Sequence, residues 1–240
     1  MLDAHEKLLT CPTKKNKVDL SGYDYQRDIV NRTLMSLFTV FDVTVLEEVL
    51  NNSLCFPLIS LYEMLDEPED DVLASLQKLE QTKLLRIEKD AVHVDKEMRK
   101  YYEFHVLKFD DNFKADLAFL KSALKRVPMH ELAVWYPISR SADYIFDSLI
   151  EKYFTTPQTY QRYLEEIGFD DEILQNIVND VFQAPDYKIR SKHLREKYGL
   201  SRETFEYYML HLEFNFVCCL SYNQVDDYWK EVVTPIHEYR

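Results

Sequence analysis

Histidines and cysteines are the residues here that could bind a metal ion or act as nucleophiles, and their spacing argues against both roles. His130-Glu131 begins a His-Glu-x-x-His zinc motif, but Val134 occupies the position of the second histidine. The four cysteines include no CxxC pair and lie in no recognisable nucleophile motif; they are Cys11, Cys55, Cys218 and Cys219. We therefore expect no bound metal and no catalytic thiol.

Glycines and carboxylates give no stronger sign of an enzyme. The three glycines, Gly22, Gly168 and Gly199, are too far apart to form a glycine-rich phosphate loop. Adjacent carboxylates are frequent, as in Asp110-Asp111, but neighbouring residues on a helix point in different directions and do not form an acid–base pair. We expect a non-catalytic protein without a cofactor, and an enzyme of unrecognised type is the third-ranked interpretation.

Positive charge is concentrated in one segment. From Asp186 to Arg202 the chain holds six basic and two acidic residues, a local charge of 6 − 2 = +4. If this segment is a helix-turn-helix, the first residues of its second helix would face base edges. The candidate nucleic-acid contacts are Lys188, Arg190, Lys192, Arg195, Lys197, Ser201, Arg202 and Thr204. The alternative is a solvated helix pair whose basic residues only balance an acidic chain.

Acidic residues dominate the rest of the sequence. The chain carries 29 basic and 42 acidic residues, a net charge of −13, and positions 63 to 71 hold six acids and no base. A helix with that composition repels a phosphate backbone. The charge distribution therefore favours a protein partner over DNA.

Aromatic residues supply the candidate protein interface. Tyrosine occurs 17 times and phenylalanine 14 times, and such side chains are enriched at interfaces because they bury a large area. Two neighbours on one helix cannot both face a narrow core, so we expect one member of each adjacent pair to face outward. The candidates are Tyr101, Tyr102, Tyr207, Tyr208, Tyr228 and Trp229. Core packing is the alternative for most of them.

The elements that must position these residues follow from hydrophobic periodicity and turn residues. The first half predicts a helix from about Tyr23 to Val40, a short helix over 45–50, and helices opened by Pro57 and Pro68. A short strand over 84–87, a turn and a second strand over 91–94 follow, and another helix begins near Lys96. The middle region predicts helices over 113–126 and 142–154.

The last third has a similar order of elements. It predicts helices over 157–167, 170–182 and 188–198, and a fourth over 202–212 that is capped by Ser201. A strand over 214–220, a turn over 221–224 and a final helix from Asp226 complete it. Shifting the sequence by 133 residues places Leu61 on Leu194 and Leu76 on Met209, with the strands also in frame. This agreement predicts a tandem repeat.

Each repeat resembles a winged-helix domain, over about 23–107 and 156–240, because helix, turn, helix and β-hairpin follow one another. Such domains occur in bacterial transcription regulators and in adaptor subunits of chromosome and transcription complexes. We expect a mainly α fold with short β-hairpin wings, as two winged-helix domains at 21–108 and 156–240 joined by a helical connector at 109–155. The leading interpretation is a protein-interaction adaptor that binds a protein partner or itself. The second is a transcription regulator that reads DNA with the second domain.

The N-terminal residues and the hydropathy suggest where the protein resides. Residues 1–20 are rich in lysine and threonine and predict a flexible tail, with no signal-peptide core. The longest uncharged apolar stretch is far shorter than the ~20 residues of a membrane span. Together with the unpaired cysteines, these features predict a cytoplasmic protein without a membrane partner.

Overall fold

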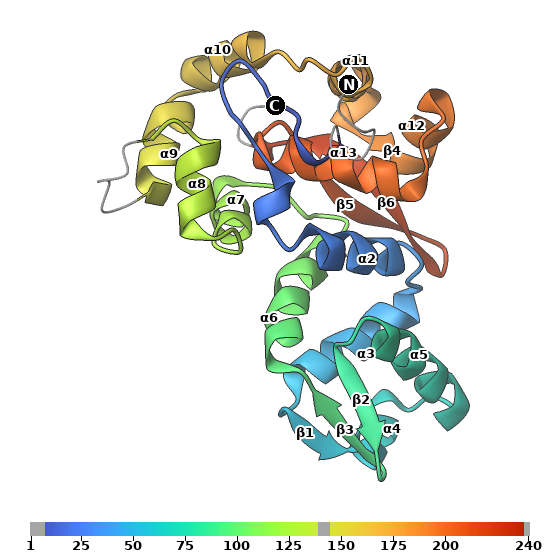
Figure 1. The fold of residues 1–240 in the computed structure, drawn as a ribbon. Helices are drawn as coiled ribbons and strands as arrows, with labels where there is room; N and C mark the ends of the chain where they lie inside the picture. Colours follow the sequence, from blue (N-terminus) through green and yellow to red (C-terminus); the bar gives the residue numbers. More distant parts are fainter. Residues whose placement is uncertain (1–7, 139–144, 238–240) are drawn as a thin grey trace. The chain divides into compact units, whose positions relative to one another are not determined.

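A computed structural model describes residues 8–138 and 145–237 of the chain (Figure 1). Over these residues the protein is mainly helical, with two small three-stranded antiparallel sheets, which confirms the predicted mainly α class with short hairpins. No helix among the described residues is both long and apolar enough to cross a membrane.

The described residues divide into two compact units. Unit 1 contains residues 8–29, 114–138, 145–221 and 231–237, and unit 2 contains residues 30–113 and 222–230. The predicted connector therefore gives most of its length to unit 1, as helices α7 (Leu117–Leu124), α8 (Met129–Trp135) and α9 (Ile145–Phe154). The predicted start of the last of these helices, residues 142–144, lies outside the described residues.

The main elements of unit 2 are four helices and a small sheet. The helices are α3 (Val40–Asn51), α4 (Leu58–Leu65), α5 (Glu69–Gln81) and α6 (Lys96–His105), and the strands are β1 (Cys55–Pro57), β2 (Leu85–Glu88) and β3 (Ala91–Val94). The sheet order is β1-β3-β2. Leu46, Leu61, Val72, Leu76 and Leu79 are fully buried and form its core, as the helical periodicity predicted.

The helix predicted over Tyr23 to Val40 is shorter, and the helix predicted over 45–50 begins earlier, at Val40. The helix α2 (Tyr25–Met35) ends before Thr39, whose side chain accepts a hydrogen bond from the Asp42 amide at 3.0 Å. The Asp42 carboxylate accepts one from the Thr39 amide at 2.8 Å and completes a capping box. The continuous apolar pattern concealed this local start signal, so the predicted boundary between the two helices was wrong.

Unit 1 contains a second helix-turn-helix and a longer hairpin. Its further helices are α10 (Pro157–Ile167), α11 (Glu172–Gln183), α12 (Ser191–Tyr198) and α13 (Arg202–Phe214). The strands β4 (Ile189–Arg190), β5 (Cys218–Val225) and β6 (Tyr228–Pro235) pair in the order β4-β6-β5. Residues 222–230, the tip of the β5–β6 hairpin, belong to unit 2, where the Asp111 carboxylate accepts a hydrogen bond from the Gln224 amide at 2.7 Å.

The two helix-turn-helix segments correspond residue by residue at the predicted offset of 133. Helices α4 and α5 begin and end 133 residues before α12 and α13, and β2 begins 133 residues before β5. Asp66 and Gly199, which follow the first helix of each pair, both have a positive φ, and so do Lys83 and Phe216. The offset is lost within the hairpins, because β2 and β3 have four residues each and β5 and β6 have eight.

Three predictions for the two ends of the chain are wrong. The expected turn over 221–224 lies inside β5, and the expected final helix is the strand β6, which is rich in aromatic and β-branched residues. The described part of the expected flexible tail packs into unit 1, where Asn16 and Leu20 are fully buried. The backbone amide of Lys17 donates to the carbonyl of Trp135 at 2.8 Å.

Candidate functional site

The second helix of the first pair, α5, presents an acidic and neutral surface. Glu69, Asp70 and Asp71 form its first turn and are exposed, and Ala74 and Gln77 continue the exposed face. Its one lysine near this region, Lys78, forms an ion pair with Asp42 of α3 at 2.8 Å. This face could attract a cationic partner but repels phosphate.

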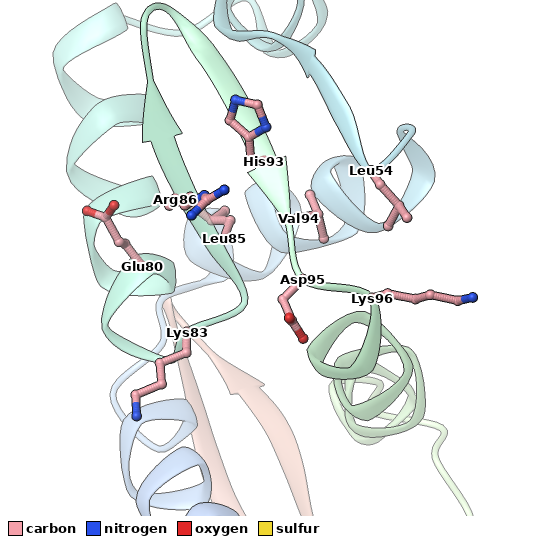
Figure 2. A pocket seen from close by; sticks show the side chains of 9 residues that line it. All are labelled: Leu54, Glu80, Lys83, Leu85, Arg86, His93, Val94, Asp95 and Lys96. Carbon is pink, nitrogen blue, oxygen red and sulfur yellow. The ribbon is translucent and has the colours of Figure 1, made fainter.

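A hollow of about 640 Å³ lies in unit 2 beside the β2–β3 hairpin (Figure 2). Basic side chains at its edge point in different directions, with Lys83 and Lys96 directed away from one another (Figure 2). Both of its acids bind backbone amides: Asp95 accepts from Met98 at 2.8 Å, and Glu80 accepts from Ile87 at 3.4 Å. A small-ligand site requires charged or polar groups that converge on one point. The charged groups around this hollow do not converge.

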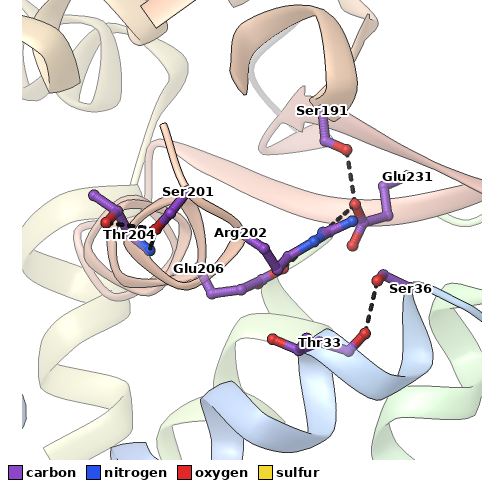
Figure 3. Close-up of polar contacts among 8 residues, drawn as sticks. All are labelled: Thr33, Ser36, Ser191, Ser201, Arg202, Thr204, Glu206 and Glu231. Carbon is purple, nitrogen blue, oxygen red and sulfur yellow. Dashed lines mark hydrogen bonds and ion pairs between the residues drawn. The ribbon is translucent and has the colours of Figure 1, made fainter. Parts of the chain in front are cut away.

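Most of the predicted nucleic-acid contacts lie in the second helix pair, α12 and α13, where two glutamates bind Arg202 (Figure 3). Its guanidinium donates to the Glu206 carboxylate at 3.1 Å and also forms an ion pair with Glu231 of β6. The Ser191 hydroxyl donates to the same Glu231 oxygen at 2.7 Å. Because Glu206 and Glu231 are buried, Arg202 offsets their charge, and its guanidinium is already bound to carboxylates.

Ser201 is the N-cap of α13, and Thr204 is its hydrogen-bond partner in the first turn, whereas both residues were expected to face bases. The Ser201 hydroxyl accepts from the Thr204 amide at 3.0 Å and donates to the Thr204 hydroxyl at 2.9 Å. These contacts satisfy an unpaired amide of the first turn of α13, as an N-cap does.

The remaining basic residues are divided between ion pairs and solvent. Lys197 pairs with Asp180 of α11 at 2.7 Å, and Lys192 approaches Glu196 at 3.7 Å. Lys188 and Arg190 are exposed, and Arg195 is half-buried. The predicted +4 segment therefore contains Lys188, Arg190 and Lys192 as its exposed cations near the start of α12.

The outward face of α13 is buried, unlike that of α5. Tyr207, Leu210 and Phe214, which correspond to Ala74, Gln77 and Gln81 of α5, have exposed fractions of 3, 0 and 4%. Within unit 1, the ring centroid of Phe214 lies 5.3 Å from that of Tyr23 and 5.1 Å from that of Trp135. The helix face that the DNA-binding interpretation needs exposed is part of the core of unit 1.

Three buried tyrosines bind consecutive carbonyl groups at the end of α13. Tyr136, Tyr163 and Tyr160 donate to the carbonyls of Phe214, Asn215 and Phe216 at 2.6, 2.5 and 2.5 Å, respectively. The buried Asn16 side chain links Tyr163 to the Asn215 side chain at 2.8 and 3.1 Å. Burial raises the pKa of Tyr163 well above its usual value. Core packing therefore explains three of the chain's many tyrosines.

The predicted interface aromatics have mixed positions. Tyr102 is fully buried and Tyr101 half-buried, as expected for one inward and one outward residue. Tyr207 and Tyr208 are both buried, so the expectation that one faces outward is wrong; Tyr208 donates to Asp171 at 3.1 Å. On strand β6, Tyr228 is 51% exposed and Trp229 is half-buried, because consecutive strand residues point to opposite faces.

A feature that sequence reasoning missed is an apolar groove of about 590 Å³ beside α10 and α11. Its signal was an apolar stripe on each helix that includes Leu164, Val178 and Phe182 and extends beyond the fully buried positions. Within the described ranges, no group of three or more histidine, cysteine, aspartate or glutamate residues could hold a metal ion.

Comparison with known proteins yields no relative. No protein-family model, no curated protein and no solved structure matches this chain.

Proposed function

We propose that this chain is a non-catalytic protein-interaction adaptor built from two winged-helix units. What supports the winged-helix assignment is the order helix, strand, helix, helix and hairpin, which occurs as α3-β1-α4-α5-β2-β3 and as α11-β4-α12-α13-β5-β6. The sheet order is also the same in both sets, with the first strand beside the third.

The observation that carries the adaptor role is the burial and charge of α5 and α13, the second helix of each pair. Helix α13 has its outward face buried at Tyr207, Leu210 and Phe214, and α5 exposes acids at its first turn. A helix that reads DNA needs an exposed face that tolerates phosphate. The buried face of α13 is closed to DNA, and the exposed acidic face of α5 favours a protein partner over phosphate.

The second candidate is a DNA-binding transcription regulator. The observation that favours it is the exposed group Lys188, Arg190 and Lys192 near the start of α12. Contacts from these residues would reach phosphates rather than base edges, so they would position the protein without providing sequence specificity.

A cytoplasmic location is part of the proposal. All four cysteines are free thiols, and Cys11, Cys218 and Cys219 are buried. Reduced thiols are the usual state in a compartment that does not form disulfides.

Affinity purification from the native host, with and without nuclease, tests the proposal. An adaptor should retain its protein partners after nuclease treatment, whereas a DNA regulator should lose whatever is bridged by nucleic acid. A titration of random duplex DNA at ~0.15 M salt should give a Kd no tighter than the non-specific ~10⁻⁴–10⁻⁶ M. Submicromolar binding would favour the regulator.

A further inference from the structure

The groove beside α10 and α11 has an apolar wall. Leu164 of α10 and Val178 and Phe182 of α11 line it and are half-buried, and the buried Tyr160 and Phe169 lie at its base. Its volume of about 590 Å³ is within the range of protein ligand pockets, ~300–1,000 Å³. Half-buried apolar side chains from two helices form a surface that another apolar element could cover.

The lengths of the two helices that line the groove set the scale of a partner helix that could pack along them. Helices α10 and α11 have 11 and 12 residues. At 1.5 Å per residue each is about 16–18 Å long, which corresponds to about three turns of a partner helix. Helix-in-groove recognition uses apolar residues at i, i+3, i+4 and i+7 over this length.

The charge around the groove specifies the other face of that helix. Residues 157–183 contain Arg162 and six carboxylates. Two of these carboxylates pair with lysines from other segments, Glu166 with Lys15 and Asp180 with Lys197, so the set carries 3 − 6 = −3. Glu165 lies on the groove edge, and no lysine or arginine is among the described residues that line it. A partner with lysine or arginine beside its apolar face is therefore electrostatically complementary.

A second copy of this chain is a poor source of that helix. Its own basic helix, α12, has Leu194 fully buried against its own unit. Its apolar side is therefore not available to enter the groove of another copy.

We propose that the groove beside α10 and α11 binds a basic amphipathic helix of a partner protein, with the apolar side of that helix against Leu164, Val178 and Phe182. This proposal rests on the adaptor function and identifies the kind of partner. The basic residues of the helix would lie toward Glu165 and the neighbouring carboxylates.

A labelled synthetic peptide of about four helical turns tests the chemistry. The probe has leucine on one face and lysine on the other, and its binding to the full chain is followed by fluorescence anisotropy at ~0.15 M salt. Leu164→Gln and Val178→Gln should each weaken binding by about tenfold or more, since a buried apolar anchor is often worth more than 1.4 kcal/mol.

Val134→Gln is the matched control, because Val134 of α8 is 53% exposed in the same unit but does not line the groove. It should leave the affinity unchanged, and thermal melts confirm that all variants remain folded. Peptides with the leucines replaced by glutamine, or the lysines by glutamate, should bind at least about tenfold more weakly. The proposal would be overturned if Leu164→Gln and Val178→Gln bound the peptide as tightly as Val134→Gln. It would also be overturned if the leucine and glutamine peptides bound the wild-type chain equally.

The same variants separate this proposal from the adaptor function. A photo-crosslinker at position 164 should capture a basic helical segment of the partner in the host, and Val178→Gln should reduce that capture. If wild type and Val178→Gln retain partners equally, the adaptor function stands and the groove proposal fails. If the groove binds the peptide but nuclease-treated wild type retains no partner, the adaptor function fails instead.

Discussion

The hydroxyl of Tyr163 on α10 donates a hydrogen bond of 2.5 Å to the backbone carbonyl of Asn215, just beyond the end of α13. Asn215 is fully buried, so its carbonyl has no access to bulk water. The two residues are 52 positions apart in sequence. This contact attaches the second helix of the second pair to a helix outside the helix-turn-helix.

Replacing Tyr163 with phenylalanine should therefore destabilise unit 1. The change removes a donor and leaves a buried acceptor, which costs about 1–3 kcal/mol of unfolding free energy. Chemical denaturation monitored by circular dichroism measures the loss. Tyr228→Phe is the control because Tyr228 is 51% exposed, and it should change the stability by less than about 0.5 kcal/mol. Similar losses in both variants would contradict the role of the buried hydroxyl.

Arg202 is expected to behave as a structural residue. Arg202→Ala would leave the buried Glu206 and Glu231 without their shared cation, and breaking a buried ion pair in this way costs about 3–5 kcal/mol. Lys192→Ala removes only an exposed pair with Glu196 and should cost less than about 1 kcal/mol. Denaturant melts of the two variants test the difference. A stable Arg202→Ala chain with weakened DNA binding would instead support the regulator.

His211 predicts a loss of stability in mild acid. Burial lowers its pKa from 6.5 to about 4, while its Nε2 lies 2.9 Å from the carbonyl oxygen of Leu8. Below pH 6.5 the unfolded chain binds a proton that the folded chain refuses, so the His211 contribution is complete above pH 6.5 and is lost as the pH falls toward 4.

The size of this effect can be isolated with His211→Gln, which keeps a possible donor to Leu8 but does not titrate. Urea unfolding from pH 7 to pH 4.5 should show a steeper decline for wild type, by up to about 1.4 kcal/mol per pH unit. Parallel pH profiles would show that His211 does not titrate differently in the folded chain.

The aromatic pair on α6 should separate into one core residue and one surface residue. Tyr102→Ala should cost about 3–5 kcal/mol because it empties a fully buried aromatic site. Tyr101→Ala should cost clearly less because Tyr101 is half-buried. Thermal melts compare the two, and sedimentation velocity shows whether Tyr101→Ala or Tyr228→Ala weakens association. Equal melting temperatures of Tyr101→Ala and Tyr102→Ala would contradict the division into core and surface residue. Unchanged association of Tyr101→Ala and Tyr228→Ala would remove Tyr101 and Tyr228 from the candidate interface.

The order of helices and turns was readable from the sequence because its signals are local. Pro157 at the first helical position, Ser201 as N-cap and Gly199 in the left-handed region each act within a few residues of the chain. The offset of 133 was also visible, because corresponding apolar and turn positions recur in frame. Thr39 was overlooked as a cap because the apolar pattern continued on both sides of it.

The chemical environment of the site residues was decided by contacts between distant segments. The sequence determined that Arg202 and Lys197 belong to a basic segment, but their acidic partners Glu231 and Asp180 are 29 and 17 residues away. It determined that α13 has apolar residues on several sides, but Tyr23 and Trp135 pack against Phe214 of its outward face only after the chain has folded. Periodicity shows which residues of one element can be buried together. Tertiary packing decides which of its other faces is covered, because the covering segments are distant in the chain and leave no local pattern in its sequence.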